Sequence, residues 1–169
     1  MTAPLVTLFA DASWCPETRL GAWAAWWKID GPAFTHSGVF RAAVPDSTTA
    51  EACALANGLH LLAGRHDLPR GTRIIAQTDC LGAIRILNGE PLRRMPSQAV
   101  AARSLVEGIT RLQQLRVQWR HVPGHQGGRT RRSWVNEWCD TTARALLRQA
   151  RTGAALPQHQ HNPKQELHA

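Results

Sequence analysis

The alternation of apolar and polar positions divides the chain into five strands and four helices. Runs rich in apolar and β-branched residues, bounded by turn-forming residues, predict strands. These strands are expected at residues 4–10, 21–29, 33–44, 72–78 and 116–122. Apolar residues at helical spacing predict helices at residues 48–65, 80–88, 97–114 and 134–150. The predicted order of elements is therefore βββαβααβα.

This order indicates an α/β domain. Strands that follow one another through short turns form antiparallel hairpins, whereas strands that alternate with helices pair in parallel. A five-stranded mixed sheet with helices on its faces satisfies both parts of the pattern. We expect residues 1–151 to form this one domain. Residues 152–169 have no apolar periodicity, and they are expected to form a disordered C-terminal tail.

The net charge points to a polyanionic partner. The chain has 20 Lys and Arg against 12 Asp and Glu, which gives a formal net charge of +8 and a pI near 10.9. Among the cations only Lys164 lies beyond position 151, so the excess belongs to the domain. Nucleic acid is the first candidate partner. A basic surface without a specific partner is the alternative.

Other features of the composition indicate the compartment. No run of about 18 apolar residues is present, which argues against a membrane-spanning helix. The first residues lack the pattern of a signal peptide. The four cysteines have no C-x-x-C spacing, which favours reduced thiols over a disulfide framework. We therefore expect a cytoplasmic protein without a membrane partner.

Four acidic residues lie at notable places in the predicted elements. Asp11 follows the first strand, Asp79 ends the fourth strand, Glu51 lies in the first turn of a helix, and Asp140 lies within the last helix. In a sheet of this order, the carboxyl ends of the first and fourth strands can lie side by side, and helix starts can reach the same edge. The four carboxylates can therefore converge on one site.

Each acid also has a local structural explanation. The first can brace a turn, and the acid that ends the fourth strand can cap the following helix. Thr48 and Glu51 have the spacing of a capping box. Asp140 and Arg144 have the spacing of an ion pair on a helix. Taken singly, none of the four acids therefore identifies a site.

Convergence of four carboxylates would require divalent cations between them, because the charges otherwise repel one another. An all-oxygen set of this charge suits Mg²⁺, which keeps waters and substrate phosphate in its coordination shell. A basic protein with a two-magnesium carboxylate site is typical of phosphodiester hydrolysis, in which one ion activates water and the other stabilises the leaving oxygen.

The motifs around these acids resemble those of the type 1 ribonuclease H family. That family joins an acid after the first strand, a T-x-x-E-like helix start, a T-D strand end, and a G-H-x-G loop that leads into N-E-x-x-D. In this chain the corresponding stretches are "FADAS", "STTAE", "QTD", "PGHQGG" and "VNEWCD", in the same order. They span residues 5 to about 150 on the matching βββαβααβα pattern.

The resemblance implies a catalytic and metal-binding quartet of Asp11, Glu51, Asp79 and Asp140. In it, Asp11 would bridge two Mg²⁺ ions, for which Mn²⁺ can substitute. Asp140 would serve the ion that activates water, and Glu51 and Asp79 the ion at the leaving group. His125 matches the mobile histidine of the family, which assists proton transfer or product departure; the alternative is a loop histidine without a role.

The resemblance also implies substrate contacts. Thr48 and Thr49 stand where asparagine is common in the family and could donate hydrogen bonds in the minor groove of a hybrid. Asn136 and Glu137 match the N-E pair, and Asn136 lies one helical turn from Asp140, so a supporting role and a packing role are both open. The expected contacts are Thr48, Thr49, Asn136, Arg129, Arg131 and Arg132.

Several positions depart from the family pattern. Ala12 replaces the usual glycine after the first aspartate, and Cys80 and Leu81 replace a polar pair. The loop "GHQGGRTRRSWVNE" is longer than usual and gains three arginines. The segment "NGEPLRRMPS" is too short for the basic handle that grips the hybrid in some members. Arginines in the longer loop are expected to take over part of that grip, with a solvated basic loop as the alternative.

The resemblance implies an endonuclease that cuts the RNA strand of an RNA–DNA hybrid and leaves 3′-hydroxyl and 5′-phosphate ends. RNA would be distinguished by its 2′-hydroxyls across a wide minor groove. The enzyme is expected to act as a monomer. A nuclease of the same fold with another nucleic acid substrate, and a non-catalytic hybrid-binding module, are the alternatives.

Overall fold

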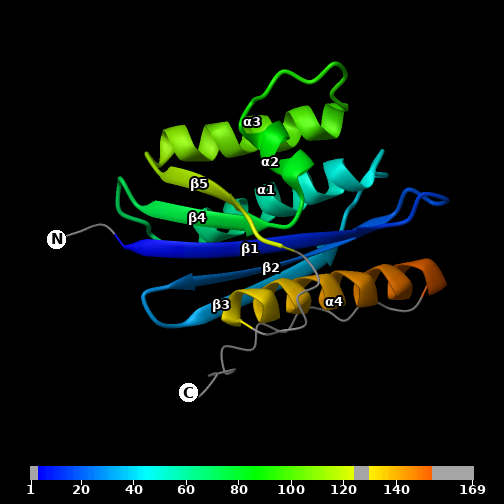
Figure 1. Cartoon of the computed structure of the whole chain (residues 1–169), viewed down its shortest axis with the longest axis horizontal. Helices are drawn as coiled ribbons and strands as arrows, with labels where there is room; N and C mark the ends of the chain where they lie inside the picture. Colours follow the sequence, from blue (N-terminus) through cyan, green and yellow to red (C-terminus); the bar gives the residue numbers. More distant parts are fainter. Residues whose placement is uncertain (1–3, 124–129, 154–169) are drawn as a thin grey trace.

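The computed structural model describes residues 4–123 and 130–153 (Figure 1). The strands are β1 (Leu5–Trp14), β2 (Gly21–Ile29), β3 (Ala33–Val39), β4 (Arg73–Thr78) and β5 (Arg116–His121). The helices are α1 (Ser47–Arg65), α2 (Leu81–Leu87), α3 (Ser97–Leu112) and α4 (Arg131–Thr152). The order βββαβααβα that the apolar pattern predicts is therefore confirmed.

The five strands form one mixed sheet in the spatial order β3-β2-β1-β4-β5. The first three strands pair antiparallel, whereas β4 pairs in parallel with both β1 and β5. Helices α1, α2 and α3 lie on one face of the sheet and α4 lies on the other (Figure 1). The central position of β1 places it between two partner strands and between two layers of helix.

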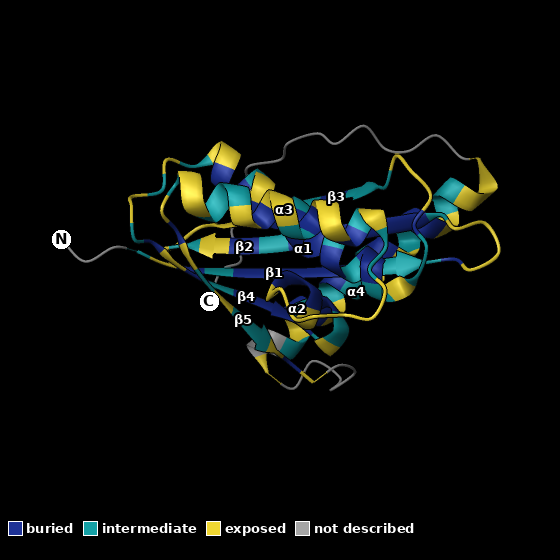
Figure 2. Cartoon of the chain, turned by 90° about the horizontal axis from the view of Figure 1, so that it is seen from above, coloured by how far each residue is buried: buried dark blue, intermediate teal, exposed yellow. Residues whose placement is uncertain are grey.

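The core has two parts because β1 presents alternate residues to opposite faces. Val6, Leu8 and Ala10 belong to the large cluster beneath α1 and α3. Phe9 packs on the other face with residues of α4, among them Val135 and Cys139. Figure 2 shows the resulting pattern, in which β1 and the inward sides of the helices are buried and the outer helix surfaces are exposed.

Three predicted boundaries are wrong by three residues or more. Strand β1 was expected to end at Ala10 but continues to Trp14, because residues as far as the Trp14–Gly21 pair remain bonded to β2. Strand β3 ends at Val39 and not at residue 44. Helix α4 begins at Arg131 and not at residue 134, because Thr130 caps it: the Thr130 Oγ1 accepts a hydrogen bond from the Ser133 N–H at 3.1 Å.

Other predictions concern the chain as a whole. Helix α4 ends at Thr152, and the tail expected to be disordered lies almost entirely outside the described residues. The four cysteines are free thiols. Within the described ranges, every helix is too short or too polar to cross a bilayer.

Candidate active site

Asp11 lies inside β1, just beyond the point where β1 stops pairing with β4. The parallel pairing of β1 with β4 ends at Phe9 and Gln77, while β1 continues alongside β2 and places Asp11 opposite Ala24. Asp11 is on the same face of β1 as Phe9, and its side chain is almost fully enclosed, because the residue is 4% exposed. The prediction that Asp11 follows the strand is wrong, since the strand runs through it. The turn proposed as its alternative role is wrong for the same reason.

Glu51 belongs to α1 and lies beside this part of β1. Asp46 caps the helix by accepting a hydrogen bond from the Thr49 N–H at 2.7 Å, so the capping box considered as an alternative for Thr48 and Glu51 is absent. Glu51 is the fifth helical residue, beyond the first turn. Its Oε2 accepts a hydrogen bond from the Ala12 N–H at 3.2 Å, which holds the carboxylate beside Asp11.

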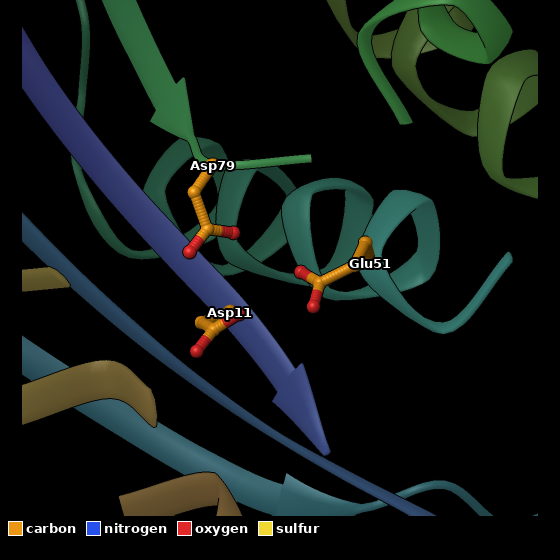
Figure 3. A group of neighbouring side chains, drawn as sticks. All are labelled: Asp11, Glu51 and Asp79. Carbon is orange, nitrogen blue, oxygen red and sulfur yellow. The ribbon is translucent and has the colours of Figure 1, made fainter. Parts of the chain in front are cut away.

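Asp79 completes a cluster of three acids. It follows the last residue of β4, and the short helix after it begins without a side-chain cap, so the capping role considered for Asp79 is absent. One carboxyl oxygen from each of Asp11, Glu51 and Asp79 lies within 4.8 Å of the other two. Figure 3 shows the three side chains, which come from β1, from α1 and from the tip of β4.

Two groups hold Asp79 in place. The Asn136 Nδ2 donates a hydrogen bond to the Asp79 Oδ2 at 3.3 Å. The His121 Nε2 lies 3.1 Å from the Asp79 backbone carbonyl. From the sequence, a role beside Asp140, a packing role and a substrate contact were all open for Asn136; its bond joins α4 to the end of β4. The contact of His121 was not foreseen, although the register that pairs Thr78 with His121 places the ends of these two parallel strands together.

Asp140 belongs to α4, which lies on the side of the sheet opposite to α1. Its Oδ1 lies 2.8 Å from the Arg144 Nε, so the ion pair considered from the sequence is present. Asp140 nevertheless lines a hollow of about 460 Å³ together with Asp11, Glu51 and Asp79. The structure therefore brings all four acids to one cavity, three of them in close contact and the fourth at its wall.

The electrostatics of the cavity favour bound cations or protons. Burial raises the pKa of Asp11 from its ordinary value of 3.8 to about 6, and the nearby Asp79 and Asp140 carboxylates add to the rise. Burial and the charge of Asp11 raise the pKa of Glu51 well above its ordinary value. Because each ionised acid disfavours the next, a divalent cation would relieve the repulsion. An all-oxygen donor set that is partly buried suits a hard divalent ion.

The other expected site residues have different fates. Thr49 is 1% exposed and its Oγ1 donates to the Asp46 Oδ2 at 3.0 Å, so its side chain has no surface left for a substrate. Thr48 is partly exposed and packs against the short helix α2, where its Cγ2 lies 2.6 Å from where a Cβ on Gly82 would be. Glu137 is exposed and lines the acidic cavity.

The predicted arginine loop differs from the structure in part. His125 and Arg129 lie outside the described residues. Arg131 and Arg132 are not loop residues, because they form the first turn of α4. Their backbone positions put them one or two turns before Asn136 and Asp140 on the same helix.

Comparisons with known proteins agree with this architecture. The sequence model of the RNase H family matches residues 3–148. No curated protein sequence matches the chain. Among solved structures, the N-terminal RNase H domain of Rv2228c from Mycobacterium tuberculosis superposes with a TM-score of 0.66 at 14% identity, covering 90% of this chain and 100% of that one.

Two further structures are similar in fold. LC11-RNase H1, solved in complex with an RNA/DNA hybrid, has a TM-score of 0.66 at 14% identity and covers 86% of this chain and 98% of its own. RNase H1 from the halophilic archaeon Halobacterium salinarum has a TM-score of 0.56 at 20% identity, with 89% of this chain and 99% of that chain covered. At these identities the structural likeness establishes the fold.

Proposed function

The chain belongs to the RNase H family, and from this premise we propose that it is a metal-dependent endonuclease that cuts the RNA strand of RNA–DNA hybrids. The observation that carries the proposal is the convergence of four acids, from β1, α1, the end of β4 and α4, on one cavity in a chain of net charge +8. A protein that only bound the hybrid would bind better without these repulsive charges facing phosphate.

The residues of the cavity have distinct tasks in this proposal. Asp11, Glu51 and Asp79 would hold Mg²⁺, and Asp140 would face the water that attacks the phosphate. When bound, the cations activate that water and stabilise the leaving oxygen. Breakage of the bond between phosphorus and the 3′ oxygen leaves 3′-hydroxyl and 5′-phosphate ends.

The neighbouring groups support these tasks through contacts that do not involve the substrate. The Ala12 N–H fixes the Glu51 carboxylate, and the Asn136 amide fixes the orientation of the Asp79 carboxylate. A side chain held in one orientation loses less conformational freedom when it binds a cation. His125 keeps its proposed part in proton transfer or product departure.

One incubation tests the proposal. Labelled RNA–DNA hybrid, duplex RNA and duplex DNA are each mixed with the protein, with and without Mg²⁺, and the products are separated by size. We expect cleavage of the RNA in the hybrid alone, and only with the metal present. Cleavage of duplex DNA or duplex RNA would favour a different substrate, and binding without cleavage would favour a non-catalytic module.

Asp79→Asn provides the matched control. It removes one anionic ligand but keeps the size of the side chain, so it should lower the cleavage rate at least about 100-fold, or about 2.7 kcal/mol of transition-state stabilisation. Binding of the hybrid should be unchanged or tighter, because a negative charge facing phosphate is gone. Retention of more than about a tenth of the wild-type rate would reject the assignment of Asp79.

A further inference from the structure

A second charged feature lies on the half of the sheet that α4 leaves open. Helix α4 packs against β1, β2 and β3. The parallel registers place Arg73 beside Arg116, and Gln77 beside Arg120, across β4 and β5. Gln77 is also paired with Phe9, which packs against α4, so these side chains point to the α4 side of the sheet. No described helix covers the α4 side of β4 and β5.

The charge on this face has one sign. Arg73 and Arg116 are exposed and Arg120 is partly exposed, and within residues 4–123 and 130–153 none of the three forms an ion pair. The residues that alternate with them on the same face, Ile75 and Gln118, are uncharged. By contrast, Arg85, Arg103 and Arg144 each pair with an acid on their own helix or just beyond it. Three guanidinium groups are therefore left for an external anion.

This basic strip, defined by Arg73, Arg116 and Arg120, leads to the acidic cavity. From Arg116 to Arg120 the strand advances about 13 Å. At the end of the strand, Arg120 lines a smaller hollow of about 210 Å³. That hollow shares Pro123, Ser133 and Asn136 with the wall of the acidic cavity. A chain of phosphates that enters the cavity can therefore continue along the strip.

We propose that the basic strip binds the phosphates of single-stranded RNA that continues beyond the hybrid. The choice of this polyanion rests on the proposed function, because the strand that reaches the acids is the one that is cut. The strip is narrow because its cations lie on two neighbouring strands of the sheet. Its width therefore suits the sugar–phosphate backbone of one nucleic-acid strand. No aromatic side chain belongs to it, so the contacts are to phosphate and carry no sequence preference.

The test measures binding without catalysis. Fluorescence anisotropy in EDTA gives the affinity for a blunt hybrid, for hybrids with an RNA overhang at the 5′ or the 3′ end, and for hybrids with DNA overhangs of equal length. The test variant carries Arg73→Ala, Arg116→Ala and Arg120→Ala. The control variant removes the same charge from exposed helical sites through Arg111→Ala, Arg148→Ala and Arg151→Ala. Thermal unfolding verifies that both variants fold.

An RNA overhang at one end should tighten binding by the wild-type protein and by the control variant. The test variant should lose this gain but bind the blunt hybrid as the control variant does. The salt dependence of overhang binding should flatten by about 0.7 log–log unit for each phosphate that the test variant no longer binds, or about two units for three phosphates. If neither RNA overhang tightens binding, if a DNA overhang does so equally, or if the test variant keeps the gain, the proposal is rejected.

Cleavage of the blunt hybrid with Mg²⁺ is measured separately on all three proteins. A wild-type protein that binds the overhang through the strip but cuts no hybrid would contradict the proposed function alone. A wild-type protein that cuts the blunt hybrid but gains nothing from an overhang would contradict the strip alone.

Discussion

The buried carboxylates of the cavity are held in place by their neighbours. Their burial lowers the stability of the metal-free protein. Asp11 and Glu51 come from different elements, yet the Ala12 N–H and the surrounding core keep them together. Neither acid is needed for packing, since an amide of the same shape would fill the same space. The conflict between charge and burial is what makes this place suitable for a cation, and it is measurable as a dependence of stability on pH.

Replacement of Asp11 by Asn should stabilise the metal-free protein at neutral pH. The pKa of Asp11 rises from 3.8 to about 6 in the folded state. The folded state therefore keeps a proton that the unfolded state releases, and stability falls as the pH rises from 3.8 through 6. A rise of this size corresponds to at most about 3 kcal/mol. The Tm of Asp11→Asn should exceed that of the wild type at pH 7.5, and the difference should shrink toward pH 4.

Addition of Mg²⁺ at pH 7.5 provides the control. It should raise the Tm of the wild type more than that of Asp11→Asn, because the variant has one ligand fewer. An equal Tm difference between the two proteins at both pH values would contradict the electrostatic explanation.

The resemblance located all four acids but not the contacts that hold them. The predicted order of the strands was already enough to place Asp11 and Asp79 near each other. The bond from Asn136 to Asp79 was not foreseen, because helical spacing reports neighbours on one helix and cannot report a contact with a strand end. Asp46 was overlooked as the helix cap, although it stands just before "STTAE", because Thr48 and Glu51 also had the spacing of a capping box.

Contacts between neighbouring elements decide where a strand ends and how closely two helices pack. Strand β1 continues beyond the apolar run that ends at Ala10, because its backbone pairs with β2 as far as Trp14. Helix α2 approaches α1 closely because Gly82 has no side chain where Thr48 lies. Neither effect can be read from the periodicity of one segment, since both depend on a segment distant in the sequence.

Gly82→Ala tests the contact between α1 and α2. In an open position of a helix, alanine would stabilise the protein by up to about 1 kcal/mol over glycine. Here the new Cβ would lie 2.6 Å from the Thr48 Cγ2, and overpacking of this kind costs roughly 1–3 kcal/mol. The Tm should therefore fall. Thr48→Ser removes the methyl group, so the double variant should recover the wild-type Tm or exceed it, and a rise in Tm for Gly82→Ala alone would show that Thr48 yields without strain.

The first turn of α4 contains two arginines where a helix favours acids. Cations near a helix N-terminus oppose the helix dipole, at a cost of about 0.3–1 kcal/mol each. Arg131→Ala with Arg132→Ala should therefore leave the Tm unchanged or slightly higher. If these residues grip the hybrid, the same variant should raise KM far more than it lowers kcat and flatten the salt dependence of binding. A KM and a salt slope equal to those of the wild type would place the grip elsewhere.

The fold of the whole chain agrees with the one that the apolar pattern predicted. The order of elements implied a mixed sheet, and the sheet is mixed, because consecutive hairpins and strand–helix alternation admit few other arrangements. The position of α4 over β1, β2 and β3 was not predictable, since it depends on side chains that meet only in the folded protein. That position brings Asn136 to the end of β4, leaves β4 and β5 open, and packs Leu146 and Leu147 against Cys15 and Ala22.

A chain shortened after Gly153 should retain full stability and activity. Gly153 ends α4 in the left-handed conformation, with φ of 67°, which glycine adopts without strain. All four acids and the family match over residues 3–148 precede this point. Thermal unfolding and the kcat/KM for hybrid cleavage should both equal those of the full chain. A chain shortened after Arg144 is the matched control, because it removes the buried Leu146 and Leu147 and should lose at least several degrees of Tm. A loss of Tm or activity on removal of residues 154–169 would show that the tail contributes to the folded domain or to its grip on the substrate.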